Sequence, residues 1–187
     1  MKVTETRIPA VRIIRPQRFD DPRGFFSETY NRRKFAEAGI PQEFVQDNQS
    51  LSKPRGTVRG LHFQIPPFAQ DKLVRVLRGS IQDVAVDLRK GSPTFGQHIS
   101  AVISAAGFEQ ILVPVGFAHG FCTLEPDTEV VYKVTHYYSA ECDKGILWND
   151  PDLGIEWQVT AEAAILSEKD RQHPPLTELP EQYLFPL

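Results

Sequence analysis

The stretch Gly79-Ser80-Ile81-Gln82-Asp83-Val84-Ala85-Val86-Asp87-Leu88 alternates along its length and decides the fold class. In an extended chain the even-numbered side chains from position 82 to 88 share one side, which is mostly aliphatic. The odd-numbered side chains, two of them aspartates, share the other side. A period of two over this length predicts a β-strand with one packed face.

Other segments repeat this alternation, and turn residues separate them. Short strands about 8–15 residues apart predict an antiparallel sandwich or barrel rather than an α/β sheet. The Ala106-Gly107 step predicts a tight hairpin between the strands on either side of it. The expected strands are Leu73–Leu77, Ile99–Ile103, Gln110–Val113 and Glu129–His136.

Helices are expected to be few and short. Asn31 is suited to cap a helix that ends near Ala38, since Gly39 can follow it at the C′ position. Ser167 is suited to begin a second short helix, with Asp170 at the N3 position. The proline-rich segment 174–187 is expected to wrap the surface.

Composition places the chain in an ordinary class of globular protein. Its 187 residues are 41% hydrophobic and 24% charged and contain no repeat or linker, so one domain over residues 1–187 is expected. A net charge of −3 argues against nucleic-acid partners, and no apolar run is long enough to cross a membrane. Residues 1–18 do not resemble a secretory signal, so a cytoplasmic protein is expected. Cys122 and Cys142 are expected to be reduced thiols, with a single bridge between them as the alternative.

Polar residues on the predicted strands are candidates for chemistry. Alternation puts Arg59 and His62 on opposite faces, but Gly60 between them can host a β-bulge that redirects one of them. Lys72 lies on the apolar side of its strand, which is costly unless the ammonium group has partners. Both His62 and Lys72 have a structural alternative. His62 could be a structural histidine with satisfied hydrogen bonds, and Lys72 could reach water at the end of its strand.

Three further positions have two readings each. Arg23, in the turn Asp21-Pro22-Arg23-Gly24, either faces solvent or faces an anion. His119 follows the tight turn Pro114-Val115-Gly116, and Tyr132 shares a face with apolar neighbours, where a core role is the alternative. His62 and His119 could be two metal ligands, but a first-row divalent site normally has three or four, so no metal is expected.

Several motifs together resemble the dTDP-4-dehydrorhamnose 3,5-epimerase family of the cupin superfamily. The match runs in order from about residue 3 to residue 180, and eight motifs in register are far more specific than any one of them. The motifs are Asp21-Pro22-Arg23-Gly24-Phe25-Phe26, Val45-Gln46-Asp47-Asn48-Gln49-Ser50, Arg59-Gly60-Leu61-His62, Gln70-x-Lys72-Leu73-Val74-Arg75-Val76, Asp83-Val84-Ala85-Val86-Asp87, Pro114-x-Gly116-Phe117-Ala118-His119-Gly120-Phe121, Gly145-Ile146-x-Trp148-Asn149-Asp150-Pro151 and Leu166-Ser167-x-Lys169-Asp170.

This resemblance implies a mainly β protein, with a cupin-type double-stranded β-helix (a jelly-roll barrel) and a few short peripheral helices. It implies epimerisation at C3 and C5 of dTDP-4-dehydro-6-deoxy-D-glucose to dTDP-4-dehydro-L-rhamnose, in dTDP-L-rhamnose biosynthesis. Neither a metal nor a redox cofactor is implied, and a homodimer is expected. The alternatives are a single-carbon epimerase of another dTDP-4-keto-6-deoxysugar, a metal-dependent cupin enzyme and a non-catalytic sugar-nucleotide-binding module.

The resemblance also assigns residue roles. His62 corresponds to the catalytic base, Asp170 to the carboxylate that orients it, Tyr132 to the acid, and Lys72 to the residue beside the 4-keto oxygen. The implied substrate-binding positions fall into three groups. Sugar and diphosphate positions are Arg59, His119 and Lys169; nucleotide-side positions, some supplied across a dimer interface, are Arg23, Phe26, Glu28, Gln46 and Asn48; Tyr138 corresponds to a thymine-stacking residue and Asp143 to a substrate-binding residue.

The chemistry of these residue types agrees with the implied reaction. In a 4-keto sugar the protons on C3 and C5 are acidic because the enolate is delocalised, and inversion needs a base on one face and an acid on the other. Histidine suits the base and tyrosine the acid, while an inward lysine can stabilise the enolate. The sequence departs from the family pattern at Phe63 (often Tyr), Ala140 (often Pro) and Asp143 (commonly Glu), which bears on the exact substrate.

Overall fold

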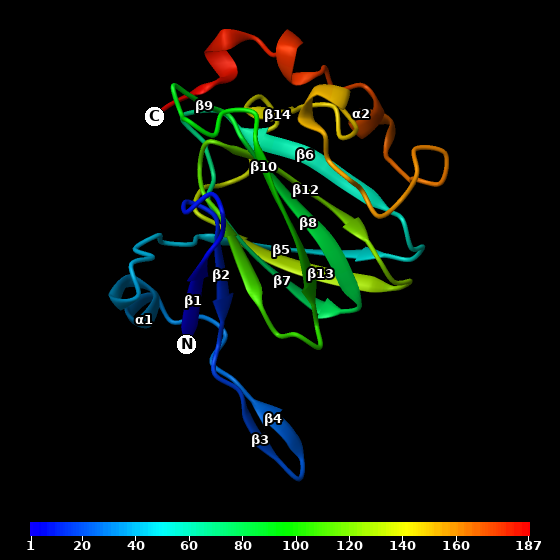
Figure 1. Cartoon of the computed structure of the whole chain (residues 1–187). Helices are drawn as coiled ribbons and strands as arrows, with labels where there is room; N and C mark the ends of the chain where they lie inside the picture. The colour runs from blue at the N-terminus through cyan, green and yellow to red at the C-terminus, as the bar shows by residue number, and fades with distance from the viewer.

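Two antiparallel β-sheets face each other in a computed structural model that describes residues 1–187 (Figure 1). This architecture confirms the mainly β prediction. The six-stranded sheet has the order β1 (Lys2–Glu5), β2 (Arg12–Arg15), β11 (Gln110–Val113), β7 (Lys72–Arg78), β13 (Thr128–Val134) and β5 (Gln46–Ser52). The five-stranded sheet has the order β10 (His98–Ser104), β8 (Ser80–Asp87), β12 (Phe117–Thr123), β6 (Val58–Gln64) and β14 (Asp143–Gly145).

The strand β8 is packed on both faces, so the expectation of a single packed face is wrong. Ile81 and Ala85 join the core between the two sheets, while Val84 and Val86 join a second cluster on the outer side. That outer cluster is covered by the C-terminal segment, whose strand β15 (Phe185–Pro186) pairs with β9 (Arg89–Lys90). The alternation of β8 therefore separates two buried environments instead of core from solvent.

The predicted hairpin at Ala106-Gly107 is also wrong. β10 and β11 flank this step but belong to different sheets, so the turn carries the chain across the sandwich. Instead of β11, β10 pairs with β8 over its whole length. A tight turn read from sequence does not show whether the flanking strands pair, because that depends on which neighbours bury their side chains.

A bulge in β6 changes which side chains face the space between the sheets. His119 of β12 pairs with His62 of β6. Two residues further along β12, Phe121 pairs with Arg59, which lies three residues before His62 on β6. The register therefore shifts by one residue at Gly60. Gly60 has φ +131°, and a Cβ there would lie 2.5 Å from the Cα of Gly120. The possible bulge noted at Gly60 is therefore present, and two glycines allow β6 and β12 to approach at that point.

Both short helices begin where their caps predict. The Asn31 side chain accepts a hydrogen bond from the Lys34 backbone at the start of α1 (Arg32–Glu37). The Ser167 hydroxyl accepts one from the backbone of Asp170 in α2 (Glu168–Arg171). Three single-turn 3-10 helices complete the periphery, at Pro151–Leu153, Leu176–Glu178 and Glu181–Tyr183.

A two-stranded hairpin projects away from the sandwich (Figure 1). It consists of β3 (Phe19–Asp21) and β4 (Gly24–Phe26), and all six strand residues are exposed. Phe26 is the most exposed of its aromatic side chains, at 72%. None of the helices has the length and apolar content needed to cross a membrane.

Candidate active site

A cavity of about 470 Å³ opens between the sheets near one end of the sandwich. Both sheets contribute to its walls: β6 and β12 from one side, and β5, β7 and β13 from the other. The segment 165–170, which contains the start of α2, lines a third side. Seven sequence-predicted site residues line this cavity, namely Arg59, His62, Lys72, His119, Tyr132, Lys169 and Asp170.

A histidine–carboxylate pair is the shortest polar contact among these residues. His62 Nε2 lies 2.5 Å from Asp170 Oδ1, and Asp170 is only 4% exposed. Burial alone would raise the pKa of the Asp170 carboxyl, but the hydrogen bond from His62 and the attraction of its charge hold that pKa below its usual value. A carboxylate in this position fixes the histidine tautomer and supports the charged imidazolium, as an orienting acid does.

Lys72 brings a cation to the opposite wall. Its Nζ donates to the backbone oxygen of His62 at 3.3 Å, which places the ammonium group beside the histidine strand. Burial lowers the pKa of Lys72 to about 8, against the attraction of Asp143 and Asp83. A lysine with a pKa of about 8 can stabilise a developing oxyanion while it is charged, and it loses that charge in mildly alkaline solution.

Tyr132 and Arg59 complete the polar lining, one on each of the two facing walls. Burial raises the pKa of the Tyr132 phenol, although the nearby Arg59 partly opposes this. The phenol is therefore protonated at neutral pH and available as a donor. Arg59 Nε donates to Ser52 Oγ at 3.1 Å, which fixes the guanidinium on the cavity side of the bulge. Without the bulge, Arg59 and His62 would face opposite ways, as strict alternation requires.

A second buried histidine–carboxylate pair lies deeper in the five-stranded sheet. His119 Nε2 is 2.9 Å from Asp83 Oδ2, and Asp83 is fully buried. The Asp83 carboxylate thus orients the His119 ring, whose exposed fraction is 7%. The structure gives His119 a fixed direction at the cavity wall.

The rim carries a chain of polar contacts. Lys169 forms an ion pair with Asp143, whose carboxylate also accepts from the Tyr138 hydroxyl at 3.2 Å. Gln46 accepts a hydrogen bond from the Tyr138 backbone at 3.2 Å and donates to Asn48 at 2.9 Å. Asn48 pairs in register with Tyr132, so it lies next to the proposed acid. Tyr138, Asp143, Gln46 and Asn48 therefore adjoin the cavity without lining it.

The hairpin positions do not reach this cavity in the same chain. Arg23 forms an ion pair with Asp21 within the hairpin turn, and Phe26 follows on β4. Glu28 forms an ion pair with Lys34 of α1 at 2.8 Å. Of the five predicted nucleotide-side residues, Arg23, Phe26 and Glu28 therefore make their contacts outside the cavity that His62 lines.

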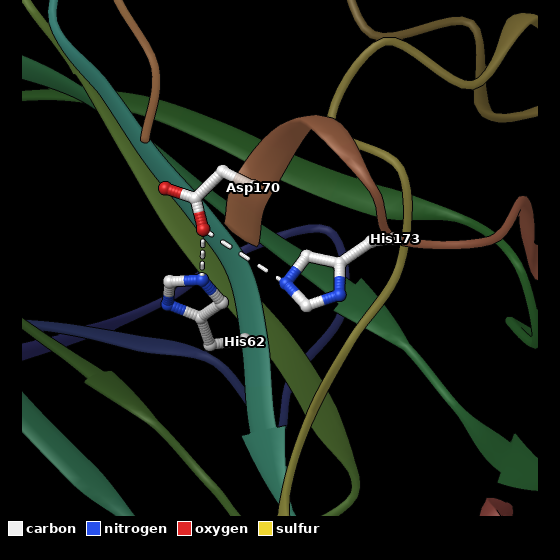
Figure 2. A group of neighbouring side chains, drawn as sticks. All are labelled: His62, Asp170 and His173. Atoms are coloured by element: carbon white, nitrogen blue, oxygen red, sulfur yellow. Dashed lines mark hydrogen bonds and ion pairs between the residues drawn. The ribbon is translucent and has the colours of Figure 1, made fainter. Parts of the chain in front are cut away.

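His173 is a cavity neighbour that the sequence analysis missed. Its Nε2 lies 3.8 Å from Asp170 Oδ1, and its ring meets the His62 ring edge-on (Figure 2). The only sequence signal is its spacing of three residues from Asp170. The ligand atoms of His62, Asp170 and His173 all lie within 4.8 Å of one another, which makes this trio the group that could hold a metal ion.

The fold and the site together define a class: a jelly-roll enzyme whose cavity has a histidine–carboxylate pair on one side and a lysine and a tyrosine on the facing wall. The profile of the family described as dTDP-4-dehydrorhamnose 3,5-epimerase matches residues 5–178. The chain belongs to this family.

Full-length relatives agree with that assignment. A dTDP-4-dehydrorhamnose 3,5-epimerase from Sinorhizobium fredii is 52% identical over 178 residues, 95% of this chain and 91% of the relative. The crystal structure of the Bacillus anthracis enzyme of that name, with TDP and PPi bound, is 53% identical, with a TM-score of 0.90 over 93% of this chain and 98% of that one. A Legionella pneumophila dTDP-6-deoxy-D-glucose-3,5-epimerase in complex with dTDP-4-keto-L-rhamnose is 41% identical, with a TM-score of 0.95 over 100% and 98%. These structures confirm the cupin-type expectation.

Proposed function

We propose that the chain converts dTDP-4-dehydro-6-deoxy-D-glucose to dTDP-4-dehydro-L-rhamnose by epimerisation at C3 and C5, in dTDP-L-rhamnose biosynthesis. The observation that carries the residue assignment is the contact of 2.5 Å between His62 Nε2 and Asp170 Oδ1 at the wall of the cavity. The relatives described above support the substrate and the reaction.

Proton removal falls to His62. Its Nε2 is held by Asp170, so its other ring nitrogen, Nδ1, is the free acceptor for a proton from C3 or C5. The imidazolium that forms is stabilised by the Asp170 carboxylate. As the C–H bond breaks, the electron pair moves into the C–C bond next to the carbonyl, and negative charge develops on the 4-keto oxygen.

Lys72 is assigned to that oxygen and Tyr132 to the return of the proton. The ammonium group of Lys72 compensates the enolate charge in a partly desolvated site, where such donors act strongly. Tyr132 lies on β13 of the six-stranded sheet, whereas His62 lies on β6 of the other sheet. Base and acid therefore approach a bound sugar from facing walls, which is the arrangement that inversion requires.

Lys72 is expected to set an alkaline limit on the rate. Because its pKa is lowered to about 8, the ammonium form prevails below that pH and is lost above it, so kcat should fall as pH rises through 8. Lys72→Met removes the cation and should lower kcat by about 10²–10³-fold, as deletion of an oxyanion donor does. Its remaining pH profile should lack the decline near pH 8, as measured by initial rates from pH 6 to 10. If the fall in kcat near pH 8 persists in Lys72→Met, a group other than Lys72 causes it.

The anionic part of the substrate is assigned to cations at the cavity and its rim. Arg59 and Lys169 lie on the lining, and guanidinium groups suit phosphate oxygens. His119 is assigned to the sugar side, and Tyr138 is assigned to stack on the base. Since the chain has a net charge of −3, this attraction is local to the cavity.

We further propose a homodimer in which the hairpin of one protomer reaches the nucleotide side of its partner's cavity. Arg23, Phe26 and Glu28 lie outside their own cavity, and the hairpin exposes Phe19, Phe25 and Phe26 to solvent. Exposed aromatic clusters of this kind are typical of protein interfaces. Sedimentation equilibrium is expected to give twice the mass of one chain, and Phe25→Ser/Phe26→Ser should weaken the association; a wild-type monomer at micromolar concentration would contradict it.

The activity is tested by incubating EDTA-treated protein with dTDP-4-keto-6-deoxyglucose in deuterated water. NMR should show deuterium at both C3 and C5. Deuterium at C3 alone would indicate a single-carbon epimerase. Activity that depended on an added metal would favour a metal-dependent cupin enzyme. No label, with retained dTDP binding, would overturn the proposed reaction but not the nucleotide site.

A further inference from the structure

Two imidazole rings converge on one carboxylate oxygen at the candidate base. Asp170 Oδ1 lies 2.5 Å from His62 Nε2 and 3.8 Å from His173 Nε2, and the two rings meet at 76° with centroids 5.5 Å apart. Figure 2 shows one ring nitrogen of each histidine directed toward this oxygen. Proton abstraction is assigned to His62 and its partner Asp170, and His173 lies beside both.

A glycine makes room for the His173 ring. Gly145 of β14 pairs in register with His62 of β6, and a Cβ on Gly145 would lie 2.4 Å from His173 Nε2. Pro174, the residue after His173, is anchored by a hydrogen bond of 2.8 Å from the Leu147 backbone N–H to its carbonyl oxygen. The absence of a side chain at position 145 thus creates the space that the ring occupies beside His62.

His173 Nε2 is a buried polar atom without a hydrogen-bond partner, in a side chain that is 11% exposed. An unpaired buried donor is costly, and Asp170 Oδ1 is an acceptor 3.8 Å away. Closing the gap by about 0.8 Å would bring the two atoms within hydrogen-bond distance. A small rotation of the ring would therefore satisfy the buried, unpaired nitrogen of His173.

We propose that His173 is a positioning residue for the epimerase reaction: it donates to Asp170 Oδ1 and so restricts both the place of this carboxylate and the strength with which His62 holds a proton. The inference deepens the proposed function and rests on it for the meaning of the pH profile, but the geometry of the three side chains is independent of the substrate. His173 is not assigned contact with the sugar.

The groups that face His173 keep it a neutral donor. Burial lowers the pKa of His173, and the adjacent His62 and Lys169 lower it too, while Asp170 and Asp143 raise it. The net direction is downward, so near neutral pH the ring carries one proton, which Asp170 attracts to Nε2. The two imidazoles then compete for one oxygen, and the share that His62 receives is smaller than it would be alone.

Removing the donor at position 173 should change the pH at which His62 loses its proton in one direction, upward. Without a donor at position 173, the Asp170 charge is fully available to the His62 imidazolium, which then holds its proton to higher pH. Since proton abstraction needs His62 in its neutral form, the acid limb of kcat/KM should move upward. We expect a shift of about half a pH unit in His173→Leu, which removes the donor and keeps apolar bulk. His173→Gln restores an N–H donor that cannot titrate, and its acid limb should return toward that of the wild type.

The decisive measurement does not need turnover. In protein labelled with ¹⁵N at the histidine rings, the NMR titration midpoint of His62 should rise in His173→Leu and return in His173→Gln. Gly145→Ala, which displaces the His173 ring by contact, should act in the same direction as His173→Leu. Equal midpoints in the wild type and His173→Leu, or equal shifts in His173→Leu and His173→Gln, would overturn the proposal. Wild-type protein that shows the titration without epimerising the sugar would overturn the proposed function alone.

Discussion

Replacing His62 by alanine is expected to lower kcat by about three to four orders of magnitude, the upper part of the range for a general base. The other two histidines near this wall have other assigned roles: His119 pairs with Asp83 at 2.9 Å and is assigned to binding, and His173 is directed at Asp170. The loss should extend to isotope exchange, because without abstraction no deuterium enters the sugar. NMR of the substrate in deuterated water measures both quantities.

Tyr132→Phe is the matched variant for this experiment. It removes one hydroxyl from the facing wall and leaves His62 and Asp170 in contact. Proton abstraction should continue, so solvent deuterium should enter the substrate while inversion largely fails. Equal and complete loss of exchange in His62→Ala and Tyr132→Phe would contradict the assignment of base and acid to separate faces.

Asp170→Asn is expected to lower kcat by about 10³–10⁴-fold, an effect comparable to that of His62→Ala. Replacing the orienting aspartate of a serine protease by asparagine has an effect of about 10⁴-fold, because the histidine is held in the wrong tautomer. Here the amide can donate to His62 Nε2, which would leave the proton on Nδ1, the nitrogen assigned to the substrate. Steady-state rates measure the loss, and thermal unfolding shows whether the variant is folded.

Asp83→Asn provides a control for the Asp170 variant, since it alters the other buried histidine–carboxylate pair. His119 is assigned to binding and not to proton transfer, so this change should raise KM more than it lowers kcat. A similar fall in kcat for both variants would mean that the two pairs act together in the chemical step. The comparison separates loss of orientation at the base from general disturbance of a buried pair.

The strand pattern could be predicted from sequence because alternation is local. Both helix caps were readable for the same reason, since Asn31 and Ser167 bond to backbone groups three residues away. The pairing of β10 and β11 could not be inferred, because sheet membership depends on contacts between distant segments. The second buried face of β8 was hidden too, because the segment that covers it comes almost a hundred residues later in the chain.

The site was predictable where a resemblance supplied positions, and less so where geometry decides. Seven of the predicted residues line one cavity, but Arg23, Phe26 and Glu28, on or just after the exposed hairpin, do not. His173 carried no motif, and its relevance follows from the glycine at position 145 that makes room for it. A glycine and the side chain that occupies the space beside it, such as Gly145 and His173, can be recognised only in the three-dimensional structure when they are distant in sequence.

The bulge at Gly60 has a consequence for how this enzyme tolerates change. Neither Gly60 nor Gly120 has a functional group, yet a Cβ on Gly60 would lie 2.5 Å from Gly120 Cα, and one on Gly120 would lie 2.6 Å from the Arg59 carbonyl oxygen. Any substitution would force apart the strands that aim Arg59, His62 and His119. In a saturation mutagenesis screen for activity, these two chemically inert positions should therefore be as intolerant as the proton-transfer residues, and directed evolution toward other sugars will have to leave both unchanged.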